Sequence, residues 1–111
     1  MPHAPSYLEI LPSARDDIAG IQEYNPEHAE RILKKIQDWQ EKIQWGRVPQ
    51  EHMTYLTDAG PYNFYRDYVG KSGYRVIYEI SSDTMRVVAV LPKGDDTYDV
   101  DELTRRMNRH T

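Results

Sequence analysis

The sequence predicts a single α+β domain in which a twisted antiparallel sheet is packed on one face by a hairpin of two helices. The first half of the chain carries apolar residues at helical spacing on both sides of Asn25 and Pro26. The second half contains runs rich in tyrosine, valine and isoleucine, separated by turn signals. A length of 111 residues suits one domain spanning residues 1–111.

Composition excludes several classes of protein. Charged residues make up 29% of the chain and hydrophobic ones 39%, which is typical of a soluble globular domain. No apolar run approaches the about 20 residues that a membrane-spanning helix needs, and the first residues lack the pattern of a signal peptide. The absence of cysteine excludes disulfides and thiolate metal sites. We therefore expect a cytoplasmic protein that has no membrane association. The histidines are too scattered to predict a metal site: His3, His28, His52 and His110.

A short strand is predicted over residues 6–11, followed by a helix over residues 14–24 with Ser13 as its N-cap. Asn25 is expected to cap a second helix over residues 26–45, because proline fits the first helical turn. This helix has the strongest periodicity of the chain, at Ala29, Ile32, Leu33, Ile36, Trp39 and Ile43. The two helices form an antiparallel hairpin whose apolar stripes face the sheet.

The second half predicts a three-stranded meander. Strands are expected over residues 62–69, 74–80 and 85–91, because these runs are rich in β-branched and aromatic residues. The intervening residues 70–73 and 81–84 read as hairpin turns. Residues 47–61 are expected to form a loop and residues 99–109 a closing helix. The predicted order of elements is therefore β-α-α-β-β-β-α.

Arg75 interrupts the central run, which reads KSGYRVIYEI. Side chains alternate between the two faces of a strand, so Tyr74, Val76 and Tyr78 face the helices while Arg75 faces the other side. Two interpretations follow. Either Arg75 lies on a solvated face and pairs with Glu79 or a nearby aspartate, or that face is functional.

The charge distribution leaves both interpretations open. Residues 62–93 hold five basic residues and three acidic ones, although the whole chain has a net charge of −4. Arg66 and Arg86, on the two flanking strands, are positioned to approach Arg75. The middle of the chain is therefore locally basic inside an acidic protein, but the excess is small enough to arise by chance.

Residues 65–99, YRDYVGKSGYRVIYEISSDTMRVVAVLPKGDDTYDV, resemble the RelE/ParE family of toxins from type II toxin–antitoxin systems. The most specific part is GYRVIYEI, and the first strand and the helical hairpin also fit the family. The resemblance implies a RelE/ParE-like fold and a cognate antitoxin, in a possible hetero-oligomer. It also implies a ribosome-dependent mRNA endonuclease that inhibits translation without metal or cofactor, by attack of the RNA 2′-hydroxyl on the adjacent phosphate.

The same resemblance assigns roles to residues. The catalytic set that it implies is Arg66, Arg75, Lys93 and Tyr98, and the RNA-binding set is Lys71, Arg86 and Tyr68. Tyr68 stands where the family pattern has a second basic residue. The closing turn, PKGDDTYD, has Lys93 as its basic group, and its two aspartates repel phosphate. The alternative function is therefore a ParE-like gyrase inhibitor, or a homologue that only binds its antitoxin.

Three further features have weaker functional interpretations. Glu51 and His52 are adjacent in the predicted loop and form either an acid–base pair or solvated surface. Trp45 is expected to contact the sheet or a partner. Arg105 and Arg106, near the C-terminus, either complement the helix dipole or contact RNA.

Overall fold

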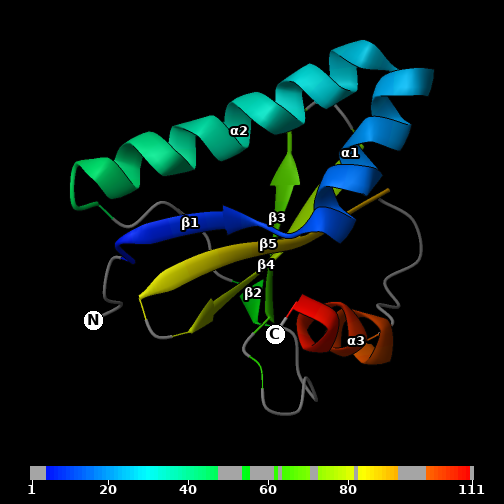
Figure 1. Ribbon diagram of the computed structural model, residues 1–111. Coiled ribbons are helices and arrows are strands. Elements are labelled where there is room, and N and C mark those ends of the chain that lie inside the picture. Colours follow the sequence, from blue (N-terminus) through cyan, green and yellow to red (C-terminus); the bar gives the residue numbers. More distant parts are fainter. Residues whose placement is uncertain are drawn as a thin grey trace.

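The computed structural model describes residues 5–47, 54–55, 62, 64–70, 73–81, 83–92 and 100–110. The helical hairpin covers one face of a twisted sheet and the last helix lies against the other face (Figure 1). In chain order, the elements are β1 (Tyr7–Ile10), α1 (Pro12–Tyr24), α2 (Pro26–Gln44), β2 (Thr54–Tyr55), β3 (Phe64–Val69), β4 (Tyr74–Ser81), β5 (Thr84–Pro92) and α3 (Val100–His110). None of the helices in these ranges is both long and apolar enough to cross a bilayer.

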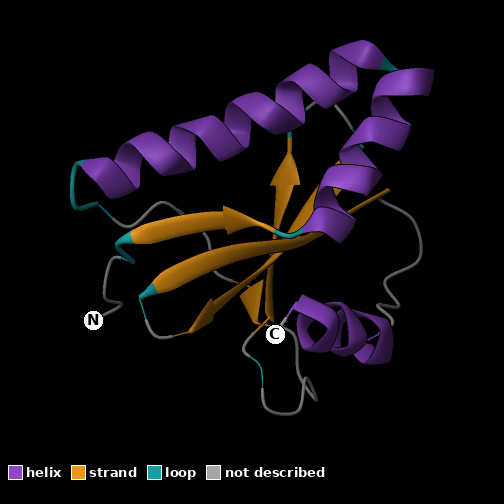
Figure 2. Ribbon diagram, in the orientation of Figure 1, coloured by secondary structure: helices purple, strands orange, loops and turns teal. Residues whose placement is uncertain are grey.

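The strands form one sheet in the order β1-β5-β4-β3-β2, and Figure 2 shows them as a single layer between the helices. The predicted meander is confirmed, because β3, β4 and β5 pair antiparallel in succession. Two details differ from the prediction. The segment expected to be a loop contains β2, which pairs with β3, and β1 pairs with β5 in parallel, so the sheet is mixed. A parallel pair needs a long crossover, which the helices and the meander supply.

The start of α1 also differs from the prediction. The helix begins at Pro12, and Leu11 rather than Ser13 is the N-cap residue. Proline suits this first position, because its missing N–H would have no partner within the helix. The Ser13 hydroxyl instead donates a hydrogen bond of 3.2 Å to the backbone carbonyl of Val88 in β5. The end of α2 agrees with the sequence, since Gly46 follows it with φ of +71°.

The larger of two hydrophobic clusters lies between the helical hairpin and the sheet. Trp39 is buried there against Tyr78, with ring centroids 5.3 Å apart, as the periodicity of the second helix predicted. Leu33 is a correction, because 45% of this residue is exposed. The turn of the helix directs Ile32 and Ile36 to the sheet and leaves Leu33 on the flank of α2.

The smaller cluster lies between the sheet and α3. Leu103 and Met107 of α3 pack on Phe64, Ile77 and Val88 of the strands. This sheet face is therefore covered by α3 along part of its length and is not open to solvent throughout. Asp101 and Glu102 lie in the first turn of α3, where the helix dipole favours acidic side chains, as predicted.

Candidate functional site on the second sheet face

The sheet face opposite the helical hairpin carries the described members of the predicted site. Arg66 and Tyr68 come from β3, Arg75 from β4 and Arg86 from β5. Lys71, Lys93 and Tyr98 lie outside the described residues, and so do Glu51 and His52.

Three of these residues come together at one end of the sheet. Tyr68 is directly opposite Arg75 in the register of β3 and β4. The guanidinium carbon of Arg75 lies 5.7 Å from the centre of the Tyr68 ring, and that of Arg66 lies 5.8 Å from it. These are cation–π distances. We call Arg66, Tyr68 and Arg75 the arginine–tyrosine cluster.

The members of the arginine–tyrosine cluster differ in exposure. Arg75 is only 2% exposed, whereas Arg66 is half-buried and Tyr68 is 44% exposed. A buried guanidinium is costly unless other groups compensate for its lost hydration, and the electron-rich ring of Tyr68 is one such group. Tyr68 and Arg66 are therefore the parts of the cluster that a ligand in solvent can contact directly.

Arg86 belongs to a different group of charges. Its Nη1 lies 3.4 Å from Oε1 of Glu79, and its Nε lies 3.5 Å from Oε2 of Glu9. Glu79 is fully buried, so Arg86 compensates a carboxylate inside the protein. The register places Ile77 between Arg75 and Glu79 on the same face of the sheet.

The surroundings of Arg75 differ from a solvated sheet face, because its side chain is only 2% exposed. Arg66 approaches the same aromatic ring as Arg75, as the hypothesis of a functional face expected. The nearby aspartate of the alternative interpretation, Asp67, points to the helical side and pairs with Lys35 at 3.3 Å. The arginine–tyrosine cluster is thus a distinct assembly rather than part of a surface network with Asp67.

The end of β5 lies beside the arginine–tyrosine cluster. Leu91 pairs with Arg75, and Pro92 pairs with Tyr74. Pro92 is followed immediately by Lys93, so the chain leaves the sheet at the end where the cluster lies. Arg75 precedes Leu91 by many residues in sequence but lies directly beside it in the sheet.

Arg106 has a structural role that the sequence analysis did not identify. Its Nη1 lies 2.7 Å from Oδ2 of Asp17 in α1, and it also donates a hydrogen bond of 3.1 Å to the carbonyl of Val88. Burial opposes the charged form of Arg106, but hydrogen bonds and attraction from Asp17 and Glu102 outweigh it and raise its pKa. The two partners are 89 positions apart, so no local pattern reveals the pair.

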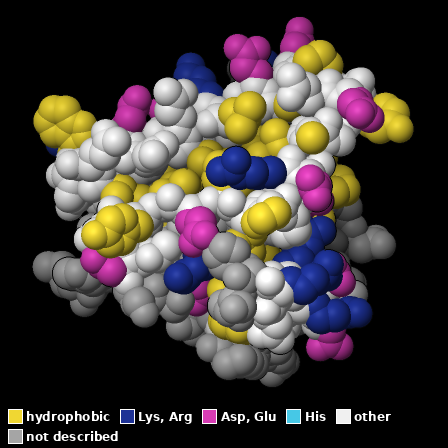
Figure 3. Space-filling model, viewed as in Figure 1, with side chains coloured by type: hydrophobic (Ala, Val, Ile, Leu, Met, Phe, Trp, Pro, Cys, Tyr) yellow, Lys and Arg dark blue, Asp and Glu magenta, His cyan; other side chains and the backbone are white. Residues whose placement is uncertain are grey.

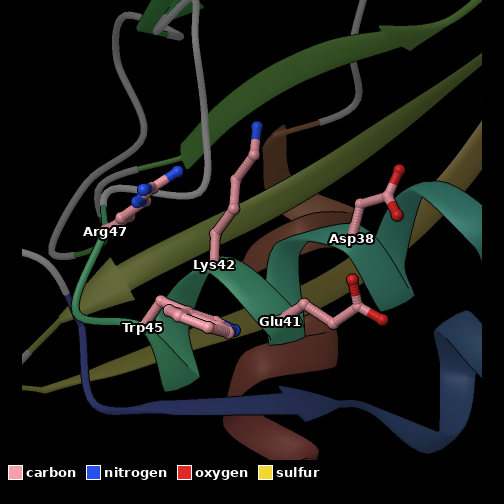
Figure 4. A pocket seen from close by; sticks show the side chains of 5 residues that line it. All are labelled: Asp38, Glu41, Lys42, Trp45 and Arg47. Atoms are coloured by element: carbon pink, nitrogen blue, oxygen red, sulfur yellow. The ribbon is translucent and has the colours of Figure 1, made fainter.

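A shallow pocket of about 360 Å³ adjoins the C-terminal end of α2 (Figure 4). Trp45 lines it and is 77% exposed, so it does not pack on the sheet. Lys42 and Arg47 contribute two positive charges, and Asp38 and Glu41 contribute two negative ones. In Figure 4, the Trp45 ring lies toward Glu41, while Lys42 and Arg47 point in other directions.

The helical hairpin on one face of a small mixed sheet is the α+β fold that the resemblance of GYRVIYEI to RelE/ParE toxins predicted. The family model described as "ParE toxin of type II toxin-antitoxin system, parDE" matches residues 8–97, so the chain belongs to this family. It is thereby a member of the RelE/ParE toxin superfamily, whose toxins have a cognate antitoxin. A search of curated proteins gave no match.

Proposed function

We propose that this toxin cleaves mRNA on the ribosome and so inhibits translation in the cytoplasm. The observation that carries the proposal is the arginine–tyrosine cluster, which combines cations with an exposed aromatic ring beside the end of β5. Single-stranded RNA is commonly bound by such a combination, because bases stack on aromatic rings and phosphates attract guanidinium groups.

Each member of the site has its own role. Arg66 binds the scissile phosphate, because a guanidinium can donate two hydrogen bonds to phosphate oxygens. Tyr68 stacks on a base next to that phosphate. We assign Arg75 a positioning role, since its side chain is only 2% exposed and lies against the ring of Tyr68. Lys93 and Tyr98 follow the end of β5, and in this proposal they bind RNA and transfer a proton.

The chemistry needs no metal or cofactor. The 2′-hydroxyl oxygen forms a bond to phosphorus while its proton passes to a basic group, and the bond from phosphorus to the 5′ oxygen breaks. The leaving oxygen takes up a proton, so the products are a 2′,3′-cyclic phosphate and a free 5′-hydroxyl. Positive groups such as Arg66 stabilise the charge that develops on the phosphate oxygens.

A gyrase inhibitor is the second candidate function, and the burial of Arg75 and the ion pairs of Arg86 favour it. Arg75 is 2% exposed, and Arg86 is held by Glu9 and Glu79. In that case the two arginines stabilise the sheet, and the toxin acts through another surface. The cognate antitoxin would bind either kind of toxin and cover its active surface.

One experiment separates the two functions. Purified protein is added to a translating extract, and the 5′ ends of the mRNA are mapped by primer extension. We expect new ends inside codons at the ribosomal A site, and we expect Arg66→Ala to remove them. Arg31→Ala is the matched control, because Arg31 is an exposed arginine of α2 on the other side of the sheet. Intact mRNA together with gyrase-dependent DNA breaks would reject the endonuclease and support gyrase as the target.

A further inference from the structure

A bulge in β5 determines which side chain of that strand lies beside Arg75. Val87 and Ala89 pair with consecutive residues of β4, so Val88 is an extra residue between them. Val88 and Ala89 both pack in the smaller cluster, and the alternation of faces is interrupted there. Because Val87 faces the helical hairpin, strict alternation would turn Leu91 to the hairpin as well. The bulge instead turns Leu91 to the second sheet face, directly opposite Arg75.

The Arg75 side chain therefore lies between two others in a row across β3, β4 and β5. Tyr68 is its neighbour in β3, and Leu91 is its neighbour in β5. Residues directly opposite in a sheet have Cβ atoms about 5 Å apart, so both neighbours are within contact distance of Arg75. The guanidinium carbon of Arg75 lies 5.7 Å from the centre of the Tyr68 ring, and Leu91 flanks the arginine from the opposite side.

Leu91 is suited to restrict the conformations of Arg75. An arginine side chain has several rotatable bonds and loses much conformational freedom when it is held in one position. Leu91 is half-buried and packs on the smaller cluster, which fixes its own position. Its apolar side chain occupies the space on the β5 side of Arg75, into which the arginine could otherwise turn away from the ring. The contribution of Leu91 is therefore one of shape and not of charge.

We propose that Leu91 is a positioning residue of the candidate site. It holds the Arg75 guanidinium against the ring of Tyr68, and it thereby holds the ring in the orientation in which it stacks on a base. The inference rests on the proposed function, because that function assigns to Tyr68 the contact with RNA. Leu91 contacts neither the RNA nor the reacting atoms, so its removal acts through Arg75 and Tyr68.

Proton NMR of the purified chain tests this arrangement without RNA. The ring current of an aromatic side chain shifts the signals of protons above its face upfield, so the Arg75 Nε proton should be upfield of those of exposed arginines. Its signal is assigned by its loss in Arg75→Lys. Leu91→Ala should move the signal toward the position of free arginine, as Tyr68→Ala does. Leu91→Met restores most of the lost volume and should return the signal.

The rate of mRNA cleavage in a single turnover on the ribosome tests the role of Leu91 in the reaction. Leu91→Ala should lower this rate by about 10-fold, because a small displacement of a positioned group can cost that much. Leu91→Met should restore it. In a chain that already carries Tyr68→Ala, the further change Leu91→Ala should alter the rate by less than about twofold. A residue that only stabilises the fold would not show this dependence on Tyr68.

Leu8→Ala is the matched control. Leu8 is half-buried, like Leu91, but it packs in the larger cluster on the other side of the sheet. Apolar side chains are visible in that layer, beneath α2, in Figure 3. Leu8→Ala removes the same atoms and should leave both the Arg75 signal and the cleavage rate unchanged. Circular dichroism shows whether each variant is folded, and Leu91→Val replaces Leu91→Ala in both measurements if the alanine variant unfolds.

The two measurements separate this proposal from the proposed function. An Arg75 signal that keeps its position when Leu91 is truncated overturns the proposal, and so does a wild-type cleavage rate in the same variant. If the signal moves but the wild-type chain does not cleave mRNA, the endonuclease is rejected while the arrangement of Leu91, Arg75 and Tyr68 is supported.

Discussion

Arg106 of α3 and Asp17 of α1 form an ion pair with an Nη1–Oδ2 distance of 2.7 Å, and both side chains also bind the backbone of β5. Asp17 accepts a hydrogen bond of 3.0 Å from the Val90 amide, and Arg106 donates one to the Val88 carbonyl. β1 pairs with β5 only up to Val87, so the strand edge beyond it would otherwise be unpaired. The pair thus closes an open sheet edge and ties α3 to α1.

Replacing either member of this pair should destabilise the fold. Arg106→Met leaves Asp17 as a carboxylate that is 80% buried without its cation, and the expected loss in the free energy of unfolding is about 2–4 kcal/mol. Urea unfolding followed by circular dichroism measures this change. Arg105→Met is the control, because the Arg105 side chain is 63% exposed and the expected loss is below about 0.5 kcal/mol. Equal losses for the two variants would show that the Asp17 pair contributes nothing specific.

Arg86 was predicted to bind RNA, and its contacts predict a measurable contribution to stability. Arg86→Met removes a cation that contacts the buried Glu79, at an expected cost of about 3–5 kcal/mol in the free energy of unfolding. Changing Glu79 to methionine as well should recover part of this loss, because the buried carboxylate is then removed together with the arginine that contacts it. A double-mutant cycle from urea unfolding gives the coupling energy.

The matched control for this cycle is Glu9→Gln. The Glu9 side chain is 41% exposed and contacts the same arginine from the solvent side, so its loss should cost less than about 1 kcal/mol. If Arg86→Met were as stable as the wild type but failed to bind RNA, Arg86 would be a binding residue and not a structural one.

The Tyr78 hydroxyl should be dispensable for folding. It is buried and has no hydrogen-bond partner in the described part of the chain, and the residue packs between Trp39 and Tyr65. A buried hydroxyl without a partner costs about 1–3 kcal/mol, so Tyr78→Phe should leave the protein as stable or make it more stable by about 1 kcal/mol. Urea unfolding at neutral pH is the measurement. Tyr24→Phe is the control, since Tyr24 is 89% exposed and should show no change.

Tyr78 also predicts a pH dependence. Burial, followed by the nearby negative charge of Asp67, raises the pKa of Tyr78 above its ordinary value of 10. Above pH 10, Tyr78 releases its proton in the unfolded state but keeps it in the folded state. The free energy of unfolding therefore falls as pH rises, by up to about 1.4 kcal/mol per pH unit. Tyr78→Phe should remove this part of the alkaline loss. An identical alkaline profile in the variant would contradict it.

The sequence predicted the elements and faces that depend on local periodicity. The burial of Trp39 and Tyr78 followed from helical and strand repeats, and so did the orientation of Arg75. Prediction from the sequence was wrong for features that depend on tertiary packing. The parallel pairing of β1 and the exposure of Leu33 depend on how elements meet in space.

In the candidate site, too, local periodicity predicted some features and tertiary packing determined the others. Alternation placed Arg66, Arg75 and Arg86 on one face, but it could not show which neighbours each one meets. The register puts Arg75 opposite Tyr68 and Arg86 opposite Glu79, so the two arginines have different cross-strand neighbours. Whether a predicted cation faces a ring or a carboxylate depends on residues far away in sequence, so periodicity alone cannot decide its role.

The proposed RNA contact of Tyr68 predicts a difference between two substitutions. If its ring stacks on a base, Tyr68→Phe should retain most of the ribosome-dependent mRNA cleavage, because a phenyl ring stacks as well. Tyr68→Ala should lower the cleavage rate by about 10-fold or more, since stacking contributes about 1–3 kcal/mol per base. The rate of appearance of new mRNA 5′ ends measures both. Thermal unfolding must accompany the assay, because the ring also contacts Arg66 and Arg75. A folded Tyr68→Ala variant that cleaves at the wild-type rate would exclude stacking on Tyr68, whereas equal losses in both variants would assign the effect to the hydroxyl.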